Sequence, residues 1–569
     1  MSARSLIVLL LVAGGAGLRG QAAPPPAPPP GTPGLPATVN SYFPARFTGE
    51  MTLTEQLYGV NGIASRRPGE SWQIGMTPNL LLFGEFSVGV NVLLSSEGSQ
   101  FRQNIGQLGL NPRIGWATFH LGDFTDNYSG YTVQGTQLRG AGVDLRPGLL
   151  RISVQGGQSQ RTVSGGLGDL TYKRNLLAAS VGVGRESGSF VDLMIVKSKD
   201  DASSLGALVT DTLLLDTIPP ALRPKVDTRP QENLVVGTRG QVQVLQNRLT
   251  VKGEVAGALT TGDESSPQVN PGSVSSGSLL NGLMPLRLST AGDYAYHVQA
   301  DANLGQASIR GGYEYVGAGY QSLGLAYLIN DRRAIDLGGT LRLLKGQLTL
   351  QGQYQHQNDN LLHQKTATTG RDALMGTASL LLGRTVTLSI TAMDNVIAND
   401  AVVDTFKIDN RSFALATNAS IQTRLLGHPS TISVSYALQH TADDNIVTQI
   451  PGVTVHNLAT SVQIPLTKAL SIAPTASLAL IQTTGAATQQ NIYLGARAQY
   501  RTGPLRTSAA LTQTFSNGRH VFGLTGQADY PLFWGSRLSV QARHTRYGAI
   551  GNQPAFQESF FIVSMARSF

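Results

Sequence analysis

Apolar residues occupy every second position through most of this chain, which is the pattern of a β-strand with two different faces. In residues 86–95 (FSVGVNVLLS) the even positions are apolar, and the odd positions are mostly small or polar. Residues 249–260 and 432–439 repeat this alternation. Such stretches are longer than the five or six residues of a typical soluble strand. The alternation therefore predicts an all-β chain built from long strands.

The composition narrows the fold class further. Asp, Glu, Lys and Arg make up only 14% of the residues, whereas a soluble globular chain carries about 25%. Disorder is excluded, because a disordered chain has more charge and fewer apolar residues than the 41% found here. After residue 18 no apolar run reaches the length that a membrane-spanning helix needs. A neutral, glycine-rich chain of alternating strands is typical of a transmembrane β-barrel.

The N-terminus indicates export. Arg4 precedes an apolar stretch at 6–18, and Gly20-Gln21-Ala22 provides small residues at a cleavage site, so residues 1–22 are predicted to be a signal peptide. A short membrane anchor is the alternative, although the apolar stretch is too short to span. Residues 23–46 hold a proline-rich run that predicts an extended periplasmic linker, or a tether for the cell wall or a partner. Together these features predict the outer membrane of a Gram-negative type of envelope.

The connections between strands alternate in length. Short ones, such as Phe83-Gly84, Gln246-Asn247 and Gly383-Arg384, alternate with long polar ones, such as 200–230 and 262–291. Outer-membrane barrels have short periplasmic turns and longer extracellular loops.

These connections allow the strands to be counted. The N-terminal strands are expected at 47–60, 71–82, 85–95, 111–121 and, weakly, 124–132. We therefore expect residues 47–569 to form a single-chain antiparallel barrel of about 26 strands, with 24 or 22 as alternatives, because bacterial barrels have even numbers. If 122–135 folds inward instead, it would be a small internal plug.

The C-terminal residues favour insertion by the barrel-assembly machinery. Phe561, Val563, Met565 and the terminal Phe569 alternate in the way that this machinery's signal does, and only Arg567 departs from it. The expected partners are therefore the assembly machinery and outer-membrane lipid, together with a periplasmic or plug partner.

Four stretches carry sequence motifs in addition to the alternation of apolar residues. They are GVNGIASRRPGESW (59–72), GYTVQGTQLRGAGVDLRPG (130–148), PQENLVVGTRGQVQVLQNRLTVKGEV (230–255) and GAGYQSLGLAYLIND (317–331). They resemble a group of large, mostly uncharacterised outer-membrane β-barrel proteins of Bacteroidota and related phyla. The group carries Asp-Pro where this chain has Gly317-Ala318. The resemblance implies the fold and the location, and no activity.

The alternation also predicts which charged side chains point into the barrel. Because a barrel of this size has an interior wider than its side chains fill, we expect a channel whose inner charges favour small hydrophilic or anionic solutes. The pore-lining candidates are Arg151, Lys252, Glu254, Arg310, Glu314, Asp336, Arg342, Arg497, Arg501 and Arg543. Seven are positive and three negative, a net charge of +4. The alternative is that these charges simply pair across neighbouring strands.

The sequence leaves other functions open beside the channel. A plugged translocation or assembly barrel, or a scaffold working with partner proteins, is the main alternative, with 200–230 or 262–291 folding inward. A TonB-dependent transporter is disfavoured because no globular plug precedes the strands. No catalytic residue, cofactor site, metal site or nucleic-acid partner is expected. There is no cysteine, and none of the nine histidines has catalytic or metal-ligand spacing. Acidic pairs such as Asp394-Asn395 are only a weak hint of Ca²⁺ binding in loops.

Overall fold

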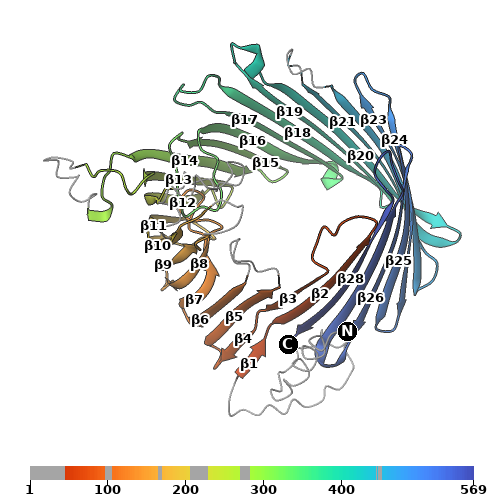
Figure 1. The fold of residues 1–569 in the computed structure, drawn as a ribbon, viewed down its shortest axis with the longest axis horizontal. Coiled ribbons are helices and arrows are strands. Elements are labelled where there is room, and N and C mark those ends of the chain that lie inside the picture. Colours follow the sequence, from red (N-terminus) through yellow and green to blue (C-terminus); the bar gives the residue numbers. More distant parts are fainter. Residues whose placement is uncertain are drawn as a thin grey trace, which may run out of the picture.

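The described part of the chain is one antiparallel sheet that closes into a ring (Figure 1). The computed structural model describes residues 45–96, 106–163, 170–205, 229–269, 282–443, 445 and 451–569. The predicted signal peptide and nearly all of the predicted linker lie outside these residues and stay predictions. No helix in the described ranges is both long enough and apolar enough to cross a membrane.

The first half of the sheet contains fourteen strand segments. They are β1 (Ala45–Thr48), β2 (Glu50–Asn61), β3 (Glu70–Met76), β4 (Asn79–Leu82), β5 (Phe86–Ser95), β6 (Gln107–Ile114), β7 (Ala117–Thr125), β8 (Gln137–Leu145), β9 (Leu150–Gln160), β10 (Lys173–Gly184), β11 (Phe190–Asp201), β12 (Glu232–Val244), β13 (Leu249–Thr261) and β14 (Thr290–Asn303).

The second half contains the other fourteen segments and three 3-10 turns. The segments are β15 (Ala307–Val316), β16 (Arg332–Leu343), β17 (Leu348–Asn358), β18 (Thr369–Leu382), β19 (Val386–Asn399), β20 (Asp409–Leu425), β21 (His428–Asp443), β22 (Val453–Pro465), β23 (Leu470–Thr483), β24 (Gln489–Thr502), β25 (Leu505–Ser516), β26 (Arg519–Pro531), β27 (Ser536–Tyr547) and β28 (Phe556–Ser568). The 3-10 turns are η3 (Leu344–Gly346), η4 (Asp404–Phe406) and η5 (Phe533–Gly535).

Two of the wall strands are broken in the middle, at facing positions. β1 pairs with β4 and β2 pairs with β3, while β3 and β4 both pair with β5. Pro78 interrupts the ladder between β3 and β4 because proline has no N–H to donate. Gly49 lies opposite this break, and a Cβ there would come within 2.6 Å of the Thr77 carbonyl oxygen. The 28 segments therefore make 26 wall strands, as the sequence predicts.

The ring closes between the ends of the chain. β2 and β28 pair over twelve residues, from Glu50 opposite Ser568 to Asn61 opposite Gln557. An even number of strands lets this last pairing be antiparallel like all the others. Closure gives β2 and β28 a neighbour on each side, so the backbone N–H and C=O groups along this junction are bonded within the sheet. At the terminal end, the short β1 pairs with β4 alone.

The expected strands at 111–121 and 124–132 are wrong. The structure has β6 and β7 in this region, joined by a tight turn at Gly115-Trp116. Gly115 has a φ of 53°, a conformation that glycine adopts without strain. The count of 26 survives because two strands do lie here. Residues 126–136 leave the wall and fold inward, which is the alternative that the sequence left open.

The two rims of the barrel differ in their connections. We call the rim where β1 begins and β28 ends the terminal rim, and the opposite one the loop rim. Turns on the terminal rim are short, such as Phe83-Gly84-Glu85 and Gly503-Pro504. Most longer connections lie on the loop rim, where Asn517-Gly518 is a two-residue exception. Parts of two long loops, 206–228 and 270–281, lie outside the described residues.

The two faces of the wall differ in chemistry, and cross-strand partners share a face. The outward face carries large apolar side chains, among them Leu193, Leu337 and Leu458, which are about half exposed. Tyr294, Tyr296, Tyr313 and Tyr315 stack on one another on this face, as expected of an interfacial aromatic girdle. Tyr547 and Phe560 do not belong to this group, because their register places both on the inner face.

A charge should be tolerated on one face and not on the other. Leu458 and Ala459 are neighbours near the middle of β22, outward and inward respectively. Leu458→Arg should lower the free energy of unfolding by about 2–4 kcal/mol, the cost of a midplane charge on the lipid face. Urea unfolding in lipid vesicles measures this. Ala459→Arg is the matched control and should change the free energy by less than about 1 kcal/mol; equal losses would contradict this assignment of the faces.

Candidate functional site

Two loops of the loop rim fold into the barrel and join. Residues 126–136 connect β7 to β8, and residues 317–331 connect β15 to β16. Gln134 and Leu325 form a parallel bridge, in which the Gln134 N–H donates to the Gly324 carbonyl at 3.1 Å and the Ala326 N–H donates to the Gln134 carbonyl at 3.1 Å. We call this joined pair of loops the inner shelf.

The inner shelf rests on a dry patch of wall. Its Val133 and Tyr320 are 0% and 1% exposed. They belong to one buried cluster with wall residues of β7, β8 and β10–β15. The wall members are Phe124, Leu138, Leu176, Ala178, Met194, Val196, Val235, Ala256, Ala258, Ala295 and Val316. Small residues leave room for the shelf, since a Cβ on the inward Gly237 would come within 3.1 Å of the Thr132 methyl group.

Polar groups fix the shelf at its centre. The Tyr131 N–H donates to Glu254 Oε1 and the Tyr131 hydroxyl donates to Glu314 Oε1, each at 2.9 Å. Glu314 also accepts a 2.5 Å bond from Arg332. Tyr320 ties the two loops together, because its hydroxyl donates to the Tyr131 carbonyl at 2.6 Å. Burial and the nearby Glu314 carboxylate raise the pKa of Tyr131, so its hydroxyl stays a donor at neutral pH.

The side-chain amide of Asn233, in the wall strand β12, binds the second loop of the shelf. The Asn233 side-chain nitrogen donates to the Gln321 carbonyl at 2.9 Å, and its side-chain oxygen accepts from the Leu323 N–H at 3.1 Å. Asn233 is fully buried. Because buried polar groups that lose their partners cost free energy, these bonds oppose any movement of the shelf away from the wall. The shelf is therefore a fixed part of the interior.

Below and beside the shelf, the inner face of β9–β16 is electrically balanced. By register it carries seven cations and seven carboxylates. The cations are Arg151, Arg174, Arg239, Lys252, Arg310, Arg332 and Arg342; the carboxylates are Asp192, Asp200, Glu254, Asp293, Asp301, Glu314 and Asp336. We call this face the paired arc. Its ion pairs include Arg151 with Asp192 at 3.0 Å and Arg174 with Asp200 at 2.7 Å.

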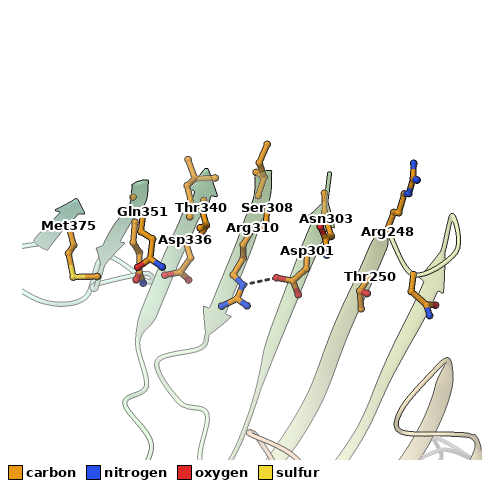
Figure 2. A pocket seen from close by; sticks show the side chains of 18 residues that line it. Arg248, Thr250, Asp301, Asn303, Ser308, Arg310, Asp336, Thr340, Gln351 and Met375 are labelled. Carbon is orange, nitrogen blue, oxygen red and sulfur yellow. Dashed lines mark hydrogen bonds and ion pairs between the residues drawn. The ribbon is translucent and has the colours of Figure 1, made fainter. Parts of the chain in front are cut away.

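A groove on the paired arc shows the same pairing (Figure 2). Arg310 and Asp301 point toward each other across neighbouring strands, with 2.6 Å between Nε and Oδ1. Asp336 lies beside them and accepts from the Gln355 side-chain amide at 2.7 Å. The groove has a volume of about 540 Å³, and its remaining lining is mostly neutral. It offers hydrogen bonds with little net charge.

The opposite side of the ring is basic. β12 and β25 face each other across the barrel in Figure 1. On the inner face of β22–β28, which we call the basic arc, register places six arginines and two carboxylates, Asp529 and Glu558. The arginines are Arg497, Arg501, Arg506, Arg519, Arg537 and Arg543. Glu558 already accepts a 2.8 Å bond from the Tyr58 hydroxyl.

All ten pore-lining candidates lie at inward positions of the register. Seven of them are on the paired arc, where the expected positive excess is cancelled by neighbours. Only Arg497, Arg501 and Arg543 are on the basic arc. Their role in lining a conducting pore stays a prediction.

The sequence indicated an inward fold only as an alternative at 122–135, and it indicated neither the second loop of the shelf nor the concentration of charge on one side of the ring. Arg506 and Lys468 were not among its candidates. A regional charge count would have found them: residues 451–569 contain nine Lys and Arg and only two Asp and Glu. That net charge of +7 leaves +1 of the chain's +8 for the other 450 residues.

One inner-wall cluster contains the residue types of a hydrolase without their arrangement. His120 contacts Asp144 at 2.9 Å, and Ser153 bonds to the same carboxylate. The carboxylate therefore lies between histidine and serine, whereas nucleophilic catalysis needs the histidine in the middle. Within the described ranges, no group of three or more histidines and carboxylates is arranged to hold a metal ion.

Comparisons with known proteins find structural likeness only. No protein-family model matches the chain, and no curated protein does. The siderophore receptor PirA of Pseudomonas aeruginosa is 12% identical, with 92% of this chain and 80% of that chain covered and a TM-score of 0.40. The PapC translocation pore of the P pilus usher is 11% identical, with 92% and 99% covered and a TM-score of 0.28. OccK2 (OpdF) of P. aeruginosa, solved with glucuronate, is 12% identical, with 92% and 98% covered and a TM-score of 0.29.

The Tyr131 hydroxyl should contribute measurably to stability. Tyr131→Phe removes the donor to Glu314 inside the shelf, so the free energy of unfolding should fall by about 1–3 kcal/mol. Urea unfolding of the refolded barrel measures this loss. Tyr327→Phe is the matched control, because Tyr327 lies in the same shelf but is 79% exposed. Equal losses in the two variants would contradict the role given to Tyr131.

Proposed function

We propose that this protein is an outer-membrane channel for small hydrophilic solutes, with a preference for anions. The closed barrel with an apolar outer face and a polar inner face is the observation that carries the proposal. A barrel of more than 16–18 strands has an interior that its side chains do not fill. In this barrel the inner shelf takes up part of that space on the side of the paired arc, so a solute passes along the basic arc.

The charges on the inner wall support the preference for anions. Rings or rows of Arg and Lys favour anions in pores. The cations of the paired arc have carboxylate neighbours that cancel their field at short range. Arg497 and Arg501 have no recorded ion pair among the described residues, and both are exposed to the interior. The uncompensated charge of the basic arc is therefore what a permeating ion meets.

Ion selectivity tests this proposal. In a planar bilayer with a KCl gradient, the wild type should show a reversal potential of the sign expected for chloride. Arg497→Glu combined with Arg501→Glu should move the reversal potential toward the potassium side, because four units of charge change on the basic arc. Arg546→Glu is a control on the outward face of β27. An unchanged reversal potential in the double variant would overturn the preference for anions.

The shelf itself favours a second function, that of a plugged translocation barrel or a scaffold for partner proteins. In that case the shelf closes part of the interior at rest, and a partner controls the opening. A periplasmic or plug partner belongs to this second proposal. The same bilayer separates the two functions: steady current from the isolated protein supports the channel, and its absence supports the plugged barrel.

The outer-membrane location is also a proposal. It is supported by the apolar outward face of the wall and by the junction of β2 with β28, which we call the seam. Phe561, Val563 and Met565 share the outward face of β28, and the terminal Phe569 stacks on Phe47 with ring centroids 4.6 Å apart. The Phe569 N–H donates to the Gly49 carbonyl at 3.0 Å. We therefore propose that the barrel-assembly machinery reads this end and that the same residues close the ring.

Changing the last residue should reduce assembly. Phe569→Ala removes the stacked ring at the seam and the terminal aromatic of the assembly signal. We expect severalfold less folded barrel in outer-membrane fractions, measured as the heat-modifiable band on a gel. Phe515→Ala, which removes an outward aromatic of β25 away from the seam, is the control. Normal amounts of folded Phe569→Ala protein would refute the signal.

A further inference from the structure

A groove on the basic arc near the terminal rim gathers four cations around one carboxylate. Its volume is about 500 Å³, and Lys468, Arg497, Arg501, Arg506 and Asp529 all line it. Four positive charges against one negative charge leave +3 in the groove. None of the ion pairs recorded among the described residues involves any of the four cations. We call it the terminal groove.

The arrangement of two of the arginines is unfavourable without a ligand. Arg501 on β24 and Arg506 on β25 are directly opposite each other in the register. Directly opposed side chains have Cβ atoms about 4.5–5.5 Å apart, and like charges at such positions destabilise a sheet. Arg506 has Asp529 as its partner on the other side, in β26. The Asp529 carboxylate accepts a 3.0 Å hydrogen bond from the Gln527 side-chain amide, which is a neutral donor.

The other two cations line the same groove. Arg497 is four residues before Arg501 on β24, and its Nη2 donates to Ser508 Oγ only at 3.4 Å. Lys468 lies in the turn between β22 and β23. That turn is attached to the pair, because the Arg501 N–H donates to the Ala469 carbonyl at 2.7 Å. The groove therefore presents three guanidinium groups and an ammonium group, with neutral donors from Gln499 and Ser508 between them.

We propose that the terminal groove is a binding site for a compact oxyanion with two negative charges, such as a phosphate group of a solute. Guanidinium groups bind phosphate oxygens through paired, charge-assisted hydrogen bonds. One dianion between Arg501 and Arg506 satisfies both and cancels their repulsion. The site deepens the proposed function, because it names the anion that the channel concentrates, but its occupancy does not depend on conduction.

Binding is measured on the folded full-length protein in detergent. Equilibrium dialysis with labelled inorganic phosphate at low ionic strength should give saturable binding of one phosphate per barrel. Sulfate should compete, because it has the same charge and shape, and chloride at the same concentration should not. Absence of saturable binding in the wild type, or equal competition by chloride, would overturn the site.

Variants locate the site. Arg501→Gln with Arg506→Gln should weaken phosphate binding about tenfold or more, because two charge-assisted hydrogen-bonding groups are lost. Lys345→Gln with Arg384→Gln is the matched control, since it removes two positive charges from turns of the same rim elsewhere on the ring. The control should bind within about twofold of the wild type. Equal weakening in both variants would mean diffuse attraction only and would overturn the site.

A second double variant tests whether a loss of binding comes from misfolding. Arg501→Lys with Arg506→Lys keeps both charges and loses the paired hydrogen bonds, so phosphate binding should be weaker than in the wild type and stronger than in the glutamine variant. Heat-modifiable migration verifies that each variant is folded. Wild-type affinity in the lysine variant would overturn the claim that the paired hydrogen bonds of the two guanidinium groups hold the phosphate.

The test separates this site from the proposed channel. Phosphate binding without current in the bilayer would support the groove and refute the channel. Anion-selective current without saturable phosphate binding would support the channel and refute the groove.

Discussion

The structure depends on one constraint: every backbone N–H and C=O in the wall needs a hydrogen-bond partner, because a membrane interior supplies none. The pairing of β2 with β28 meets this constraint by closing the sheet on itself. Closure has a second effect. Cross-strand partners share a face, so once the ring is closed the orientation of each wall residue is fixed by its register. The outward half of the wall residues must then be mostly apolar, and the chain's charge is confined to the inner face, the rims and the loops.

The same rule explains how far the sequence could be interpreted. Alternation predicts strands because it reports the two faces directly, and the number of wall strands follows from it. It fails at 111–132, because the outward positions change from even in β6 to odd in β7 at Gly115-Trp116, and the single strand expected at 111–121 runs across that change. It fails again at Tyr128, Tyr131 and Val133, whose apolar spacing comes from burial in the shelf. Tyr131 meets Tyr320 across 189 residues, and no local pattern contains that contact.

For the charges inside the barrel, prediction from the sequence has a different limit. Alternation determines that Arg310 points inward, but the charge a solute meets depends on Asp301, which lies on the neighbouring strand. Pairing cancels the positive excess on the paired arc and leaves it on the basic arc. Three of the four stretches that resemble other outer-membrane barrels form the shelf and part of the wall beneath it. The basic arc lies in the last third, where the resemblance is limited to strand rhythm, so the resemblance alone does not point to it.

The shelf and the basic arc are best understood together. At physiological salt a fixed charge acts over about 8 Å, so the arginines of a wide, empty barrel would have little effect on a solute crossing near its axis. The shelf packs on the inner face of β7, β8 and β10–β15, and Figure 1 places β12 across the ring from β25, a strand of the basic arc. In the proposed channel, a solute excluded from that side passes closer to β22–β28, toward Arg497 and Arg501. In the proposed channel, the buried contacts made by Tyr131, Asn233 and Tyr320 therefore bring the path of a solute closer to the basic arc, and the anion preference that we propose depends on the shelf staying in place.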